Sequence, residues 1–164
     1  MESVKQFGRL LNVDMNSGEC TFSRFPEAGL KCIGGRGFNA WYLYRNLSSG
    51  TDPLAPDNIL MLSCGLLTGS SAPTSARLHL NGLSPLTGIL GSSNIGGYAG
   101  AWLRSSNIAS IIVKGRSQKP AYLYIDTNGS RLIDATHLWG CDSFATQDII
   151  KRSHKDEKLT ILTI

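Results

Sequence analysis

Short apolar runs separated by polar turns make up most of this chain of 164 residues. Runs rich in Val, Ile, Leu and aromatic residues, bounded by Gly, Asn or Pro, are typical of β-strands. Apolar residues at helical spacing predict helices over 38–47 and 143–153, and a third helix is expected over 96–103. The expected strands are 7–13, 20–25, 30–33, 59–63, 76–80, 88–91, 109–114, 121–126, 131–134 and 159–164.

The order of these elements indicates the fold class. Many strands with a few helices, without regular alternation between the two, predict an α+β fold rich in β-sheet. The chain is long enough to bury a real core, and we expect one domain over 1–164. Its last apolar run, 159–164, ends with the chain, which suggests a piece of a longer protein or a split subunit.

Formal charge is almost missing from the middle of the chain. From Asn58 to Leu103 there is no acid and one formally charged residue, Arg77, among eight glycines. Glycine and proline interrupt this stretch too often for a membrane helix, which needs about twenty consecutive apolar residues. Small residues leave backbone N–H groups accessible at close range. We interpret 58–103 as a surface for a large, partly anionic ligand.

The first candidate site is the segment 92–97, Ser-Ser-Asn-Ile-Gly-Gly. Hydroxyl and amide side chains precede a glycine pair at the expected start of a helix, where N–H groups and the positive end of the dipole could bind a phosphate. An ordinary N-cap, followed by glycines that allow close helix packing, explains the same residues. Both interpretations remain open from the sequence.

Arg77 is the second candidate. If it is buried, it must meet an anion or several carbonyl groups, because an unpaired buried charge is strongly destabilising. Its planar fork suits a phosphate, a carboxylate or the sulfides of a metal cluster. An arginine at a strand end that reaches solvent is an equally simple interpretation.

Residues 35–40, Gly-Arg-Gly-Phe-Asn-Ala, match the G-x-G-x-x-A dinucleotide fingerprint between the expected strand 30–33 and the helix 38–47. The acid that this fingerprint requires about twenty residues later would be Asp52 or Asp57. Both lie in a proline-rich connection and not at a strand end. A free-standing nucleotide-binding domain is therefore not the favoured hypothesis.

Several broad classes are disfavoured by composition. The four cysteines form no C-x-x-C pair, so local spacing builds neither a zinc site nor an iron–sulfur site. The net charge is +4, but the basic residues are scattered, so we expect no nucleic-acid partner. Residues 1–5 lack the apolar segment of a secretion signal, and with free thiols we expect a cytoplasmic protein without a membrane span.

Several motifs in one fixed order are more specific for a family than any single motif. The set resembles the N-terminal domain of the tungsten-containing aldehyde:ferredoxin oxidoreductases over essentially the whole chain. Its members are Gly-Gly-Arg-Gly at 34–37, Asp-Pro-Leu-Ala-Pro-Asp-Asn at 52–58, Gly-Leu-Leu-Thr-Gly-Ser-Ser-Ala-Pro-Thr at 65–74, Arg77, Ser-Pro-Leu-Thr-Gly at 84–88 and Asn-Ile-Gly-Gly-Tyr at 94–98.

The resemblance implies an enzyme that oxidises aldehydes to carboxylic acids and passes electrons to ferredoxin through a [4Fe-4S] cluster. Tungsten, or sometimes molybdenum, would be held by two pterins, and this domain would form the platform beneath them. Arg77 would lie between pterin and cluster. Asn94 would help to hold the magnesium ion that bridges the pterin phosphates, with Ser93, Gly96 and Gly97 beside it.

The resemblance also implies what this chain lacks. The cluster cysteines and the catalytic acid and base would lie in later domains, so we expect no catalytic residue here and no activity from the chain alone. The expected partners are the remaining domains or subunit, ferredoxin and an aldehyde. An exposed platform would favour self-association into a homo-oligomer. The alternative is a non-catalytic interaction domain or split subunit that no longer binds pterin.

Overall fold

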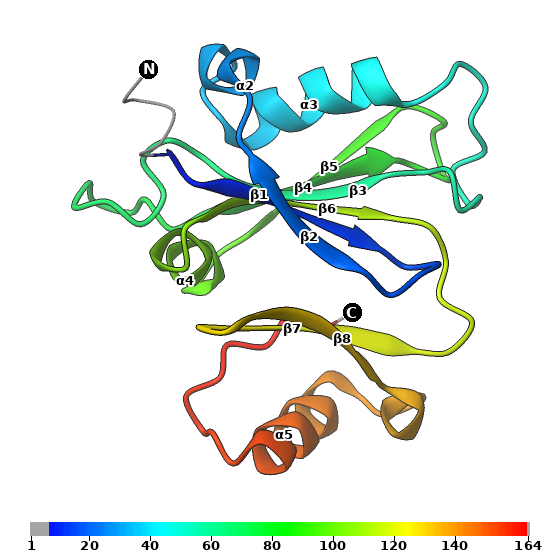
Figure 1. The fold of residues 1–164 in the computed structure, drawn as a ribbon, viewed down its shortest axis with the longest axis vertical. Helices are drawn as coiled ribbons and strands as arrows, with labels where there is room; N and C mark the ends of the chain where they lie inside the picture. Colours follow the sequence, from blue (N-terminus) through cyan, green and yellow to red (C-terminus); the bar gives the residue numbers. More distant parts are fainter. Residues whose placement is uncertain (1–6, 164) are drawn as a thin grey trace.

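A computed structural model describes residues 7–163 and shows an α+β fold built in layers (Figure 1). A six-stranded sheet forms the middle, with α2 and α3 on one face. The helix α4 and the β7–β8 hairpin lie on the other face, and α5 lies beyond the hairpin. The predicted α+β class is confirmed.

The elements are β1 (Arg9–Asp14), β2 (Cys20–Arg24), α2 (Glu27–Lys31), α3 (Gly35–Asn46), β3 (Leu60–Cys64), β4 (Leu78–Leu83), β5 (Leu90–Ile95), α4 (Ala99–Ser105), β6 (Ile108–Lys114), β7 (Ala121–Asp126), β8 (Gly129–Asp134), a 3-10 turn (Thr136–Leu138) and α5 (Ser143–His154).

The central sheet has the strand order β2-β1-β6-β3-β4-β5. Its neighbours are antiparallel except β1 and β6, which run parallel. The most buried strand is β6, whose first five residues are all buried because both faces of the sheet are covered there. At one edge lies β5, four of whose six residues are exposed to solvent. The charge-poor stretch therefore forms one half of the sheet and one of its edges.

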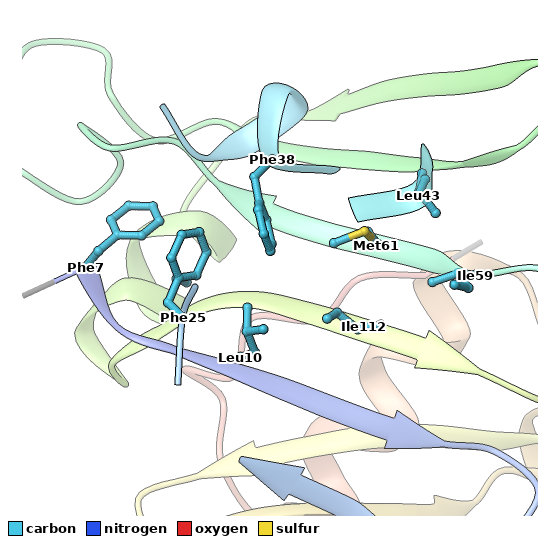
Figure 2. Packing of buried hydrophobic residues seen from close by; sticks show 9 residues of the cluster. Phe7, Leu10, Phe25, Phe38, Leu43, Ile59, Met61 and Ile112 are labelled. Atoms are coloured by element: carbon cyan, nitrogen blue, oxygen red, sulfur yellow. The ribbon is translucent and has the colours of Figure 1, made fainter. Parts of the chain in front are cut away.

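The larger core lies between α2, α3 and the sheet, as Figure 2 shows. Phe7, Phe25 and Phe38 form its aromatic end, with ring centroids 4.6 Å apart for the first pair and 4.5 Å for the second. Toward the other end, Met61 and Ile112 from the sheet pack beneath the helix. Each such side chain contributes roughly 1.5–3 kcal/mol when fully buried. This core fixes α3 over β3 and β6.

A buried polar network also joins α3 to the sheet. The Asn39 Nδ2 group donates to Asn81 Oδ1 at 2.9 Å, and Ser63 Oγ donates to Asn39 Oδ1. Ser63 is in turn hydrogen-bonded to Ser110, and Asn81 Nδ2 donates to the carbonyl of Gly91 at 2.9 Å. All four side chains are at most 2% exposed. The network therefore fixes α3 in register with β3, β4 and β6 and reaches the edge strand β5.

The other face of the sheet carries the C-terminal part of the chain. Leu123, Ile125 and Leu132 of the hairpin pack against the buried cluster of β1 and β6. The outer side of the hairpin and the 3-10 turn pack on α5 around Ile150. The expected strand 159–164 is wrong for 159–163, which are irregular. Leu159 packs against the cluster around Ile150 of α5, and the segment pairs with no described strand.

Another local prediction is wrong. Residues 30–33 do not form a strand: the chain enters α2 at Pro26, and the helix runs through Lys31. A proline at the helix start with an acid in the first turn favours this short helix, which the apolar run alone did not show. Residues 1–5, on which the expected absence of a secretion signal depends, lie outside the described residues.

Candidate functional site

The charge-poor stretch folds into β3, β4 and β5 and the loops between them. Side chains alternate between the two faces of a strand. On β4, Leu78 is buried in the cluster under α4. The next side chain, His79, lies on the α3 side, because its Cδ2 is 3.1 Å from the place a Cβ would occupy on Gly35. Arg77 directly precedes β4, and the same alternation puts its side chain on the α3 side.

Asn94 comes to the same place from the edge strand. It is paired directly with His79 in the antiparallel β4–β5 register. Directly paired residues point to the same face, with Cβ atoms about 5 Å apart. Continued by one residue, the register sets Arg77 opposite Gly96, because Leu78 is paired with Ile95. The structure therefore brings together Arg77, Asn94 and Gly96 at one end of the β4–β5 ladder.

This end of the ladder is open. Arg77, Asn94, Gly96 and Gly97 are all exposed. A Cβ added to Gly96 or Gly97 would meet nothing within 4 Å. Two hollows of the surface, of about 200 and 570 Å³, are lined by other residues. The candidate site is thus a shallow face, in contrast to a deep pocket.

Arg77 is a solvent-facing arginine at a strand end, so the alternative of a fully buried charge is wrong. Its backbone is nevertheless fixed: Thr68 Oγ1 donates to the Arg77 carbonyl at 3.1 Å and accepts from the Gly65 N–H at 3.0 Å. Behind it, a Cβ on Gly100 would come within 2.8 Å of the Ala76 carbonyl oxygen. Glycine there lets α4 approach closely enough to support the segment that carries Arg77.

The expected helix start at 92–97 is wrong. Ser92–Asn94 belong to β5, and α4 begins at Ala99 with Tyr98 as its N-cap. The hydroxyl and amide groups therefore do not cap a helix. Ser93 is paired with Leu80, so its side chain points to the face opposite Asn94, and the structure does not group it with Arg77 and Asn94.

The G-x-G-x-x-A segment lies at the N-terminus of α3, but no strand precedes it. Its glycines serve packing. A Cβ on Gly37 would come within 2.4 Å of the Cys32 carbonyl oxygen, and Gly35 has a φ of +50°. Asn39, an unspecified position of the fingerprint, belongs to the buried network under the helix. The context of a dinucleotide site is therefore absent from the described residues.

The cysteines lie apart in the fold as well as in the sequence. Cys64 is fully buried, and burial raises the pKa of its thiol to about 12. Cys141 is exposed, and the other two are half-buried. Within residues 7–163, no three His, Cys, Asp or Glu side chains come close enough to hold a metal ion. Any metal at the candidate site would thus take most of its ligands from a cofactor, water or another part of the protein.

Sequence reasoning missed His79. It stands beside Asn94 and the first turn of α3, and its Nδ1 is shielded from solvent without a hydrogen-bond partner among the described residues. Burial, followed by the positive charges of Arg36 and Arg77, lowers the pKa of this imidazole. Neutral histidine does not appear in a count of formal charges. The β4–β5 register was needed to place His79 beside Asn94.

The lowered pKa of His79 makes the stability of the fold depend on pH. The unfolded chain binds the proton more readily, so the stabilisation from neutral His79 is full above pH 6.5 and is lost as the pH falls through the folded-state pKa. We expect the free energy of unfolding to decrease from pH 7 to pH 5. Replacing His79 by Gln should flatten this part of the profile. Urea titrations across that range test it, and an unchanged slope in the variant would assign the dependence to other groups.

With the geometry established, comparison with known proteins identifies the family. The family model for the aldehyde ferredoxin oxidoreductase N-terminal domain matches residues 10–164. The chain belongs to this family. It is 35% identical to a tungsten-containing aldehyde ferredoxin oxidoreductase of Pyrococcus furiosus and 38% identical to that of Thermococcus kodakarensis, each over 96% of this chain and 26% of the relative. The resemblance found in the motifs is confirmed.

A solved structure gives the same fold. The active site complex BamBC of benzoyl coenzyme A reductase, in complex with 1,5-dienoyl-CoA, superposes with a TM-score of 0.89 at 29% identity, over 93% of this chain and 23% of that chain. The chain thus spans about a quarter of the length of the relatives that it matches. None of the helices between residues 7 and 163 is both long and apolar enough to cross a lipid bilayer.

Proposed function

We propose that this chain is the platform of a tungstopterin enzyme and forms one face of its bis-pterin site. The observation that carries the proposal is the open end of the β4–β5 ladder, where an arginine, an amide and two uncrowded glycines share one shallow face. A flat face with little side-chain bulk suits a large planar cofactor. The family and the tungsten-containing relatives support the identity of that cofactor.

The residues present fit such a ligand. Arg77 forms no ion pair in the part of the chain that the structure describes, so its guanidinium is available to an anionic group. The Asn94 amide oxygen is of the kind that magnesium prefers, and a single protein oxygen is enough where phosphates and waters complete the shell. Gly96 and Gly97 let a phosphate approach the backbone, because a side chain at either position would fill that space.

When bound, the tungsten cofactor would supply the two-electron chemistry of aldehyde oxidation. The part of this chain is to hold and orient it. Arg77 would fix an anionic edge of the pterin, while Asn94 would fix the phosphate end through magnesium. The [4Fe-4S] cluster and the groups that move protons would belong to regions beyond this chain, which would therefore be inactive alone. Ferredoxin would be the electron acceptor, in the cytoplasm.

A second candidate function is the reduction of an acyl-CoA. The structural neighbour is a reductase of benzoyl coenzyme A, so the same platform is compatible with reduction of an acyl-CoA. We favour aldehyde oxidation because both named sequence relatives are aldehyde ferredoxin oxidoreductases. They are 35% and 38% identical to this chain, whereas the reductase complex is 29% identical.

The test is made on the complete enzyme, purified without oxygen. We expect stoichiometric tungsten and pterin, measured by elemental analysis and by fluorescence of the oxidised pterin, together with aldehyde-dependent reduction of ferredoxin. Reduction of benzoyl-CoA without aldehyde oxidation would favour the second candidate. If the complete protein contains neither metal nor pterin after expression in medium supplied with tungstate, this result would support the alternative of a non-catalytic interaction domain.

A further inference from the structure

An apolar groove lies between the second half of α3 and the paired strands β4 and β5. It is the larger of the two hollows in the surface, with a volume of about 570 Å³. Ala40, Tyr44 and Leu47 line it from the helix side, where their spacing of i, i+4 and i+7 places them on one stripe. Leu83 and Leu90, which are paired directly, line it from the sheet. None of the described residues around the groove is charged.

The turn 84–89 between β4 and β5 continues this apolar surface. Its Leu86 and Ile89 are 92% and 67% exposed, and Leu90, which follows the turn, lines the groove. Tyr44 of the groove is 89% exposed. Exposed apolar residues are ordinary when they are scattered, but several on one surface mark a site of interaction. The groove and the turn therefore form one candidate docking surface.

Hydrogen bonds hold this docking surface in place. Within the turn, the Ser84 N–H donates to the Ile89 carbonyl at 2.9 Å, and the Gly88 N–H donates to the Ser84 carbonyl at 2.8 Å. At the end of β4, the Asn58 side chain donates to the Leu83 carbonyl at 3.0 Å and accepts from the Leu83 N–H at 3.2 Å. A preformed surface loses little conformational entropy when a partner binds. The groove is therefore suited to docking without rearrangement.

The lining of the groove defines the chemistry of its occupant. Because no charged residue lines it among those described, the groove offers no partner to an acid or a base, and a charge buried there would be strongly destabilising. Arg45, the basic residue in the last turn of α3, places its guanidinium over the ring of Trp41, which is not a groove residue. An occupant therefore presents apolar, uncharged side chains.

The length of the relatives indicates where such an occupant comes from. This chain spans 26% of each of the two aldehyde ferredoxin oxidoreductases, so most of their length lies outside the matched part. From the pair Leu78 and Ile95, at the cofactor end of the ladder, the groove lies five residues along β4, at Leu83, which is about 17 Å at the rise of an antiparallel strand. A region that covers the cofactor end can therefore reach the groove, and a tethered segment has a high effective concentration there.

We propose that the apolar groove and the turn 84–89 dock an uncharged apolar segment of the same enzyme, from a region outside residues 1–164. Its side chains cover Tyr44, Leu86 and Leu90, which are otherwise exposed to water. This contact fixes the further region to the platform at a place separate from the cofactor end of the ladder. It depends on the length of the enzyme and not on bound tungsten.

Photocrosslinking in the complete enzyme tests which segment lies in the groove. Tyr44 is replaced by p-benzoylphenylalanine, which has a similar ring and bonds covalently to nearby C–H groups on irradiation. We expect a product with the mass of a single chain, in which peptide mass spectrometry finds residue 44 joined to a segment beyond residue 164. The same replacement at Thr127, an exposed residue of the β7–β8 turn, should not join to that segment. A product with twice the mass of one chain would assign the groove to a second copy, and the lack of any product would show that it is open. Either result would overturn the proposal.

Thiol labelling of the complete enzyme tests whether the turn is covered. Leu86→Cys and Thr127→Cys each place a thiol in an exposed turn between paired strands, and peptide mass spectrometry separates them from the four natural cysteines. Each rate of reaction with a maleimide is divided by the rate in the unfolded enzyme. Leu86→Cys should react at least about tenfold more slowly than Thr127→Cys, because a covered thiol reacts only through local opening. Equal rates would show that the turn faces water and would reject the docking surface.

The docking surface and the proposed function can fail separately. A protected thiol in Leu86→Cys, in a complete enzyme that contains neither tungsten nor pterin, would retain the docking surface and reject the cofactor assignment. Equal labelling rates in an enzyme that contains both would retain the proposed function and reject the docking surface.

Discussion

Replacing Arg77 by alanine in the complete enzyme should reduce aldehyde oxidation by roughly a hundredfold or more, with a matching loss of bound pterin. The side chain is exposed and has no acidic partner among the described residues, so the expected loss would come from its proposed contact with the cofactor. Losing a bidentate, charge-assisted contact at a desolvated interface costs on the order of 3 kcal/mol, which is about a hundredfold. Activity and pterin content are measured on the same preparations.

The fold should survive this replacement. Arg77 is held through its backbone carbonyl by Thr68, and alanine preserves that hydrogen bond. The urea midpoint of Arg77→Ala should therefore stay close to that of the wild type. Arg24→Ala is the matched control, because Arg24 is an exposed arginine on β2, at the opposite edge of the sheet. Full activity in Arg77→Ala, or an equal loss in Arg24→Ala, would remove Arg77 from the cofactor site.

Replacing Asn39 by leucine should lower the free energy of unfolding by roughly 3–5 kcal/mol. Leucine has a similar size but leaves Asn81 and Ser63 without their partner in a fully buried place. Each buried group left unpaired costs about 1–3 kcal/mol. Asn46→Leu is the control on the same helix. Its amide is exposed and, among residues 7–163, bonds only to the carbonyl of Tyr42, so the change should stay within about 0.5 kcal/mol.

A second substitution tests the reason for this loss. The double variant Asn39→Leu with Asn81→Leu removes both partners, so it should recover part of the stability lost in Asn39→Leu alone. Urea unfolding of the four proteins gives the coupling energy. Independent, additive losses would show that the two amides do not act as a pair, and the network could then not be what holds α3 over β4.

The sequence predicted those elements whose pattern and turns agree. The hairpin β7–β8 has alternating apolar residues and an Asn-Gly turn, and both strands lie within two residues of the predicted bounds. Apolar runs also located β3 and β6, since strands covered on both faces need little alternation. The α+β class followed from the order of such elements.

Two of the local predictions failed for identifiable physical reasons. Ser-Ser-Asn before two glycines is chemically suited to cap a helix, yet pairing with β4 satisfies the backbone of 92–94 instead. The run 30–33 was too short to separate helix from strand by apolar pattern, and Pro26 decided it. In both segments, contacts with distant parts of the chain or a single local residue outweighed propensity.

The candidate site was predicted in part. Arg77 and Asn94 were singled out because charge and glycine content changed around them, and the structure puts them on one face of neighbouring strands. Because 16 residues separate Arg77 from Asn94 in the sequence, their proximity could not be predicted without the β4–β5 register. His79 was missed for the same reason, because it meets the first turn of α3 only when the helix docks beside β4.

The most direct test of the platform is a crystal structure of the complete enzyme with its cofactor, in which anomalous scattering locates tungsten. We predict that the pterins lie across the open end of the β4–β5 ladder, with a phosphate near Asn94 and an anionic edge at Arg77. Tungsten and pterin on the α4 side of the sheet, or another protein segment packed over Gly96 and Gly97, would contradict it.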